Sequence, residues 1–345
     1  MSLKTEIFEQ PAVLGRLLDT QTEPVREMAR SIGRRGVRSV FLAARGSSDN
    51  AAIYAKYLWG SVNRLPVALA APSLFTTYQA PPNLAGSLVV GISQSGQSPD
   101  IVSVLTEGRK QGALTLAITN DSTSPLAAAA EMVLDTVAGP EEAIAATKTY
   151  TSQLMAIALL AVELSGESRL ADELARLPGL VKQALALDSA IESAAQRYRY
   201  MSQCVVLGRG YNYATAYEWA LKLKELAYVV AEPYSSADFQ HGPVAIVSHG
   251  FPLLAVIPDG AVFDDVLALL SSLVGEHQAE LLAISNQDRA LDLAQTPVRI
   301  PGDLPEWLSP LVSIVPAQLF SYYLTQAMGY DTESPRRLNK ITRTW

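Results

Sequence analysis

An internal duplication constrains the fold of this chain more than any other feature of the sequence. In each matched pair an apolar run of the first half recurs in the second half, and the first pair continues through Arg-Gly into an alanine-rich stretch. The matched pairs are 40–55 with 205–220, 88–93 with 253–258, and 116–120 with 282–286. Three matches in the same order, at an offset of about 165 residues, predict two copies of one domain.

The alternation of segments within each copy indicates the fold class. Short runs of Val, Ile and Leu alternate with longer helical stretches, a pattern typical of parallel strands that are buried on both faces. The 345 residues also exceed the roughly 250 at which a single core stops growing. We therefore expect an α/β fold with two tandem doubly wound, flavodoxin-like domains, each with a parallel sheet.

The pattern also predicts where the domains begin and end. A Pro-Gly pair at 178–179 predicts a break between two helices of a connector, and the polar terminal segment with Pro335 predicts a surface tail. The predicted parts are an N-terminal helical segment (1–30), a first domain (31–166), a helical connector (167–194), a second domain (195–332) and a tail (333–345).

Composition argues against several classes of function. The net charge is −7 without a basic block, which disfavours nucleic acid as a partner. No apolar run is long enough to span a membrane, and the charged start does not resemble a signal peptide. The single cysteine, Cys204, lies in an apolar run and predicts a buried core residue in a reducing compartment. Three histidines without ligand spacing predict no metal site, so we expect a cytoplasmic, metal-free protein.

The loop SQSGQS (93–98) is a candidate phosphate site. It follows an apolar run and precedes Pro99, so Ser98 is expected to be the N-cap of a helix. A helix N-terminus offers free N–H groups and a partial positive charge, and Gly96 lets the backbone approach a ligand closely. The candidate donors are Ser93, Gln94, Ser95 and Ser98.

Two other loops bear on this prediction. ARGSSDN (44–50) would bring Ser47 and Ser48 to the same edge of the sheet, while Ser124-Pro125 is a further N-cap signature. The equivalent loop of the second copy, PDGAVF (258–263), has no serine and is expected not to bind phosphate. A solvated, serine-rich turn is the alternative interpretation of 93–98.

A second candidate site is a set of charged residues in the second copy. Glu218, Lys222 and Glu225 are spaced by four and three, which places them on one face of a helix. Lys222 and Lys224 could keep Glu225 ionised as a base, and a solvated, salt-bridged helix face is the alternative. We expect this helix to be largely buried and to open the domain at the ligand-binding edge of its sheet. His241, in the loop QHGP, could transfer protons near pH 7.

A nicotinamide cofactor is not expected. LGRGYNY (207–213) contains Gly-x-Gly but has Tyr213 in place of the third glycine, and no acidic residue follows at the usual distance.

Together with AGPEEAIAATKTYTSQL (138–154) and PRRLNK (335–340), these blocks resemble the SIS (sugar isomerase) double-domain family. Within it the chain is similar to the isomerase half of glucosamine-6-phosphate synthase and to the SIS-type glucosamine-6-phosphate deaminases.

The resemblance implies roles for individual residues and a mechanism without metal or cofactor. Glu225 falls on the glutamate that moves a proton between C1 and C2 of the sugar, beside the family's lysine at Lys222. His241 falls on the ring-opening histidine, which the partner subunit of a homodimer supplies. The residues implied to contact the substrate are Ser48, Ser93, Gln94, Ser95 and Ser98 for the phosphate, and Glu141, Ile144 and the tail lysine Lys340 for the sugar.

Some positions depart from the family pattern and leave the sugar open. Gln97 replaces a glutamate, Ala146 a serine, and Asn339 a small residue. In the synthase of this family, a glutaminase domain supplies ammonia for the synthetic reaction. The resemblance begins at EIFEQP (6–11), without that domain, so we expect the reverse of the synthetic reaction: glucosamine 6-phosphate to fructose 6-phosphate and ammonia. The alternatives are an aldose–ketose phosphosugar isomerase, a fructosamine-phosphate deglycase, or a non-catalytic sugar-phosphate-binding regulator. Glu225, His241 and Lys340 all stand at positions that match the family, and no DNA-binding helical domain precedes the first SIS domain, so we expect an enzyme rather than the regulator.

Overall fold

The computed structural model describes residues 2–340, which form two compact units. The amino-terminal unit contains residues 9–142, 146–178 and 339–340, and the carboxyl-terminal unit contains residues 2–8, 143–145 and 179–338. Residue 1 of the predicted helical segment and residues 341–345 of the predicted tail lie outside the described residues. The predicted domain boundaries stay a prediction.

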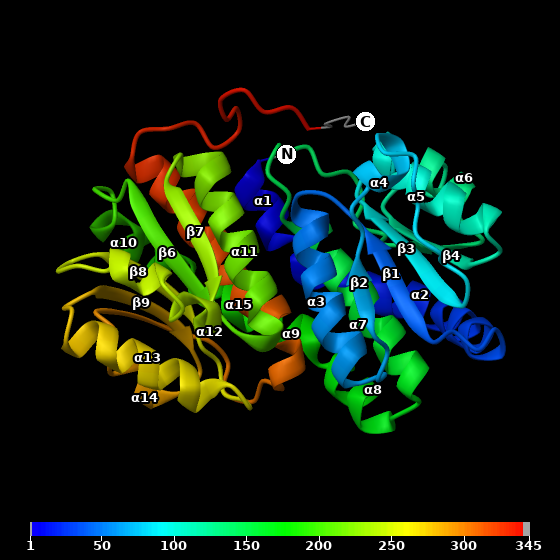
Figure 1. Cartoon of the computed structure of the whole chain (residues 1–345). Coiled ribbons are helices and arrows are strands. Elements are labelled where there is room, and N and C mark those ends of the chain that lie inside the picture. The colour runs from blue at the N-terminus through cyan, green and yellow to red at the C-terminus, as the bar shows by residue number, and fades with distance from the viewer. Residues whose placement is uncertain (1, 341–345) are drawn as a thin grey trace. The chain divides into compact units, whose positions relative to one another are not determined.

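The amino-terminal unit contains a five-stranded sheet that is parallel throughout (Figure 1). Its strands are β1 (Ser39–Ala43), β2 (Val67–Leu69), β3 (Ser87–Ser93), β4 (Leu114–Thr119) and β5 (Met132–Asp135). Their order across the sheet is β2-β1-β3-β4-β5, the flavodoxin-like order. The central strands β3 and β4 are buried almost throughout, as continuous apolar runs predict.

The carboxyl-terminal unit repeats this design. Its strands are β6 (Gln203–Gly208), β7 (Val230–Ser235), β8 (Pro252–Val256), β9 (Glu280–Ser285) and β10 (Thr296–Arg299). The sheet is parallel, and its order β10-β9-β8-β6-β7 is the first order counted from the opposite edge. The passages matched in the sequence fall on β1 and β6, on β3 and β8, and on β4 and β9. The predicted duplication and fold class are therefore confirmed.

Helices connect the strands of each unit. The amino-terminal unit contains α2 (Gln10–Arg34), α3 (Ser47–Ser61), α4 (Ser73–Thr76), α5 (Pro99–Lys110), α6 (Pro125–Ala129), α7 (Lys148–Ser165) and α8 (Ser168–Ala175). Helix α7 is buried over most of its length and packs against α2 and α3. A helix that is apolar on all sides is stable only in such an interior position.

The remaining helices are α1, at the start of the chain, and α9 to α15, of which α9 lies in the predicted connector. They are α1 (Leu3–Phe8), α9 (Leu177–Leu185), α10 (Asp188–Arg197), α11 (Tyr213–Lys222), α12 (Ser236–Phe239), α13 (Phe263–Gly275), α14 (Asp288–Leu291) and α15 (Ser309–Ala327). A π-helix, Leu223–Ala227, extends α11, and 3₁₀ turns occur at Gly210–Asn212, Pro243–Ile246 and Glu306–Leu308.

The predicted helix break at 178–179 is wrong by two residues. Helix α8 ends at Ala175 and α9 begins at Leu177, so Pro178 lies in the first turn of α9. Proline is accepted there, because the first N–H groups of a helix have no intrahelical partner and the fixed φ of proline suits a helix start.

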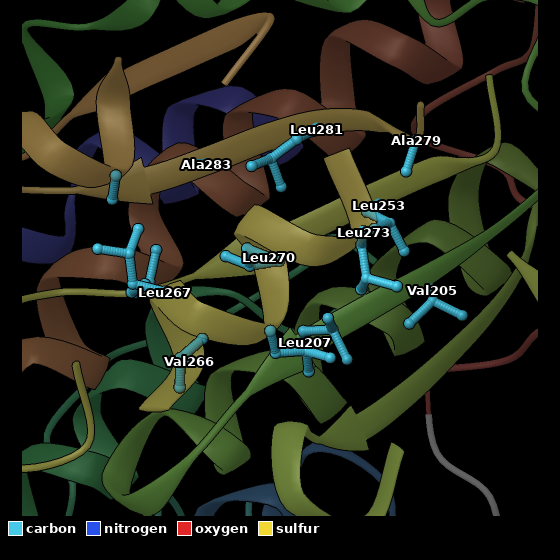
Figure 2. Packing of buried hydrophobic residues seen from close by; sticks show 14 of the residues in the cluster. Val205, Leu207, Leu253, Val266, Leu267, Leu270, Leu273, Ala279, Leu281 and Ala283 are labelled. Carbon is cyan, nitrogen blue, oxygen red and sulfur yellow. The ribbon is translucent and has the colours of Figure 1, made fainter. Parts of the chain in front are cut away.

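The core of the carboxyl-terminal unit lies between α13 and its sheet. Figure 2 shows Leu270 and Leu273 of α13 packed with Val205, Leu207 and Leu253 of the strands. Each fully buried leucine of this kind contributes about 1.5–3 kcal/mol to stability. Cys204 is buried as predicted, and burial raises the pKa of its thiol, so it stays protonated.

Candidate functional site

The candidate phosphate site lies where the first sheet changes winding direction. Strands β1 and β3 are neighbours, but β1 leads through α3 to β2 while β3 leads through α5 to β4. Right-handed crossovers then place the two helices on opposite faces of the sheet, and the loops that follow β1 and β3 separate at its carboxyl edge. Ligands of open α/β sheets bind at this point.

Two serines of the loop after β3 accept hydrogen bonds from the backbone of the same loop. The Ser93 hydroxyl oxygen accepts a hydrogen bond from the Gly96 N–H at 3.1 Å, and that of Ser95 accepts one from the Gln97 N–H at 3.3 Å. Ser98 occupies the predicted N-cap position of α5 in an extended conformation, but its side chain makes no capping bond within residues 2–340. The predicted N-cap position is therefore confirmed. In the first turn of α5, Pro99 has no N–H, and the Ile101 N–H donates to Asp100 Oδ1 at 2.9 Å.

Gly96 is required by the loop. Its φ of +61° lies in the left-handed region, and an added Cβ would come within 2.1 Å of the Ser124 hydroxyl oxygen. Ser124 caps α6 as predicted, by accepting a hydrogen bond from the Ala127 N–H at 3.3 Å. The Leu126 N–H donates to the Gly96 carbonyl at 3.1 Å, so the loop is fixed against the start of α6.

The loop after β1 supplies Ser48 and an arginine that the sequence analysis did not single out. Ser48 lies in the first turn of α3, is largely buried, and accepts a hydrogen bond from the amide of Gln153. Arg45 Nε lies 2.8 Å from a carboxylate oxygen of Asp100, which is buried in the first turn of α5. This ion pair joins the two loops. No spacing in the sequence reveals it, because its partners are 55 residues apart.

The equivalent loop of the second copy is occupied by a carboxylate of the chain itself. The Ala261 N–H donates to Glu306 Oε2 at 3.0 Å, and an added Cβ on Gly260 would meet the same carboxylate within 2.2 Å. The Asp259 N–H is likewise paired, with the Asn286 side chain at 2.7 Å. An internal anion therefore fills the place that a phosphate would take, which supports the predicted specialisation of the first copy.

The charged residues of the second copy form a tight cluster. Lys222 Nζ lies 2.5 Å from Glu225 Oε2 and 3.3 Å from Glu218 Oε1. The side chains of Glu218 and Lys222 are almost fully buried, whereas that of Glu225 is 22% exposed. The prediction that they share one helix face is confirmed, and a fully solvated face is excluded. Lys224 is exposed, and within residues 2–340 Lys222 is the lysine that pairs with Glu225.

Electrostatics keep Lys222 charged. Burial lowers the pKa of its ammonium group, but the fields and hydrogen bonds of Glu218 and Glu225 outweigh burial and raise the pKa above the usual value of lysine. The cluster thus combines one ammonium group with two carboxylates, and only Glu225 reaches solvent. A π-helix carries Glu225 and ends at Ala227, and the next residue, Tyr228, has a φ of +57°. The sequence analysis missed this π-helix, a feature that is frequent at functional sites.

The helix opens at the carboxyl edge of its sheet as predicted, but its charged residues lie at the other end of the helix. Helix α11 begins near the carboxyl end of β6, at Tyr213, but Glu225 comes twelve residues later, at the approach to β7. A helix that joins two parallel strands must run back along the sheet, at 1.5 Å per residue. Glu225 therefore lies near the amino edge of the second sheet rather than at its carboxyl edge.

Within one chain, Glu225 and His241 are not brought together. Glu225 precedes β7, and His241 follows β7 and α12 in an exposed loop. A six-residue strand is about 20 Å long at 3.3 Å per residue, so the two residues lie toward opposite ends of β7.

Glu141 and Lys340 form a second cluster in the amino-terminal unit. The buried Glu141 carboxylate accepts hydrogen bonds from the Thr147 N–H at 2.9 Å, the Thr149 N–H at 3.1 Å and the Thr149 hydroxyl at 2.7 Å. Lys340 Nζ donates to the same carboxylate at 2.8 Å. Glu141 therefore anchors both the start of α7 and the last described residue of the tail. Ile144 is half-buried and belongs to the carboxyl-terminal unit.

Residues 2–340 contain no group of three or more His, Cys, Asp or Glu side chains that could hold a metal ion. None of the helices in this part of the chain has both the length and the apolar composition needed to cross a membrane.

Comparison with known proteins now identifies the family. A family model of the SIS domain matches residues 35–163 and again residues 200–328. The chain belongs to the SIS domain family. Its SIS domains therefore correspond to the two parallel sheets described above.

Several known proteins are similar to this chain over most of its length. The glutamine–fructose-6-phosphate aminotransferase (isomerizing) of Thermococcus kodakarensis is 33% identical over 347 residues, which cover 97% of this chain and 56% of that protein. The chain thus spans just over half the length of this relative. The C-terminal domain of glucosamine-fructose-6-phosphate aminotransferase from Francisella tularensis is 28% identical with a TM-score of 0.85, and covers 96% of this chain and 98% of that one. Glucosamine-6-phosphate deaminase from Thermotoga maritima, 22% identical with a TM-score of 0.78 and full coverage of both chains, shares the fold.

Proposed function

We propose that this protein is a phosphosugar isomerase that acts at C1 and C2 of an amino-sugar phosphate. The specific reaction we propose is the conversion of glucosamine 6-phosphate and water to fructose 6-phosphate and ammonia. The observation that carries this proposal is the partly exposed Glu225 carboxylate, held 2.5 Å from the buried ammonium group of Lys222. The names of the relatives in the SIS family support the substrate class.

In this proposal the phosphate anchors the substrate. The hydroxyls of Ser93, Ser95 and Ser98 and the Gln94 side chain would bind its oxygens, with Ser48 as a donor from α3. Because the phosphate is remote from C1 and C2, its binding energy serves to orient the reacting carbons.

Glu225 would transfer the proton. In the open-chain sugar it removes the proton from C2, which gives an enolamine, and returns it to C1, which leaves an imine at C2. Water then adds to the imine and ammonia departs, leaving the ketone of fructose 6-phosphate. The ammonium group of Lys222 lies 2.5 Å from Glu225 Oε2 and would hold this carboxylate in place as the general base. His241 would assist ring opening, and Lys340, Glu141 and Ile144 would surround the sugar.

The proposal includes a homodimer in which the partner subunit's His241 serves the site of Glu225. The separation of these residues along β7 within one chain supports it. An exposed imidazole in a loop is also well placed to reach another chain.

Turnover tests the reaction. Glu225→Gln keeps the shape of the side chain and removes the base, so ammonia release from glucosamine 6-phosphate should fall by ~10²-fold or more. Affinity for fructose 6-phosphate, measured by calorimetry, should stay within a few-fold of wild type. Glu192→Gln, on exposed surface of α10, is a matched control and should release ammonia at the wild-type rate. Equal rates for wild type and Glu225→Gln would contradict the assigned role.

A further inference from the structure

A buried glutamine contacts the candidate phosphate site from behind. Gln153 lies on α7, is 2% exposed, and donates from Nε2 to the Ser48 hydroxyl oxygen at 3.0 Å. Ser48 lies in the first turn of α3, against which α7 packs. The other polar atom of this amide, Oε1, is buried and has no hydrogen-bond partner among the described residues.

The direction of this bond determines what Ser48 can do. A serine hydroxyl has one proton to donate and two lone pairs that accept. Because Ser48 accepts from Gln153, its own proton is left for another acceptor. A phosphate offers only acceptor oxygens when it is fully ionised, so a serine held in this way is matched to it.

Packing alone does not favour an amide at this position. Leu154 and Met155 beside it are fully buried, and so are Ala51 and Ala55 on α3. A buried amide with an unpaired oxygen is less favourable there than an apolar side chain of the same size, such as methionine. The amide is explained instead by what it does to Ser48.

We propose that Gln153 is a positioning residue for phosphate binding, which fixes the Ser48 hydroxyl as a hydrogen-bond donor to the phosphate of the sugar. This inference rests on the proposed function, because it deepens the phosphate site. Gln153 itself does not touch the substrate and acts only through Ser48.

A double-mutant cycle tests this dependence. Calorimetry would give the affinities of fructose 6-phosphate and of inorganic phosphate for wild type, Gln153→Met, Ser48→Ala and the double variant. Gln153→Met should weaken binding roughly 3- to 10-fold, the loss expected for one misdirected hydrogen bond. The double variant should bind no more weakly than Ser48→Ala, because without the hydroxyl there is nothing for Gln153 to position. The melting temperature of Gln153→Met should equal or exceed that of wild type.

A second variant reverses the hydrogen bond. An ionised glutamate at 153 has acceptors only, so it would take the Ser48 proton away from the phosphate and weaken binding more than methionine does at pH 8. Protonation restores a donor, so Gln153→Glu should recover affinity relative to wild type as the pH falls. Ser152→Ala is the matched control and should bind as wild type, since that buried hydroxyl donates at 2.6 Å to the Lys148 carbonyl within α7.

The outcomes separate this inference from the proposed function. Wild-type affinity in both Gln153 variants overturns the inference, and so do additive losses in the double variant or a Gln153→Met chain that unfolds. The proposed function survives any of these if Ser93→Ala/Ser95→Ala loses affinity. If the losses of affinity are coupled but the protein turns over no phosphosugar, the inference is supported and the proposed reaction is excluded. A wild-type protein that binds neither phosphate nor fructose 6-phosphate overturns both.

Discussion

Removal of the ammonium group from the Glu218–Lys222–Glu225 cluster should strongly destabilise the protein. Lys222→Met keeps the length of the side chain and leaves the fully buried Glu218 without its counter-ion. At an effective dielectric constant of about 20, charges 3.3 Å and 2.5 Å apart attract by about 5 and 7 kcal/mol before any penalty for burial. Desolvation offsets much of this attraction, and loss of one partner of a buried pair typically costs about 3–5 kcal/mol. We expect the free energy of unfolding to fall by that amount.

A urea titration followed by tryptophan fluorescence measures the change, since Trp219 of α11 is fully buried beside the cluster. Glu218→Gln/Lys222→Met should recover at least half of the loss, because it removes the orphaned charge together with its partner. The folded pKa of Lys222 is raised above the unfolded value of 10.5, so the stabilisation is fully present below pH 10.5 and is lost as the pH rises through the folded pKa. The difference between wild type and Lys222→Met should therefore be constant from pH 6 to 9. A loss below about 1 kcal/mol, typical of a surface ion pair, would refute the description of a buried cluster.

Three other predictions concern the loops and the proposed dimer. Ser93→Ala/Ser95→Ala should weaken fructose 6-phosphate binding by at least 10-fold in calorimetry, because each lost bond to a charged group is worth roughly 1.5–3 kcal/mol; unchanged affinity would remove the loop from the site. Gly96→Ala should lower the free energy of unfolding by about 2–4 kcal/mol, because of left-handed backbone strain and the clash with Ser124. Gly112→Ala is the control: its φ is +77° but its Cβ would meet open space, so it should lose only about 1 kcal/mol. Equal losses in the two variants would contradict the clash. Mixed His241→Ala and Glu225→Gln chains should regain activity through hybrid dimers, and inactivity despite demonstrated subunit exchange would exclude a shared site.

The fold was predictable because its signal is repeated and local. Apolar runs such as 88–93 and 253–258 form corresponding strands, β3 and β8, in the two copies. The matched runs follow one another along the chain in the same order in both copies, and the two sheets have the same strand order. Helix ends were less predictable: Pro178 lies inside α9, because proline is accepted in a first turn.

The candidate site was predictable only where it depends on short spacings. The i, i+4 and i, i+3 spacings of Glu218, Lys222 and Glu225 bring them together, as helix geometry requires. The Arg45–Asp100 and Gln153–Ser48 contacts and the occupation of the 258–263 loop by Glu306 join residues 45 to 105 positions apart, which no periodicity reveals. The edge at which Glu225 lies depends on how α11 runs back along the sheet, so a motif on that helix does not specify it.

The central claim is that Glu225 moves a proton between C1 and C2 of a phosphosugar, and solvent deuterium exchange tests it most directly. Wild-type protein incubated in D₂O with glucosamine 6-phosphate or fructose 6-phosphate should introduce deuterium at C2 or C1, visible by NMR. Glu225→Gln should abolish this exchange while still binding the sugar phosphate. The same protein tested on aldose, ketose and fructosamine phosphates would show which sugar it prefers. Wild-type protein that binds fructose 6-phosphate but exchanges no deuterium with any of these sugars would contradict the enzymatic account and favour a sugar-phosphate-binding protein.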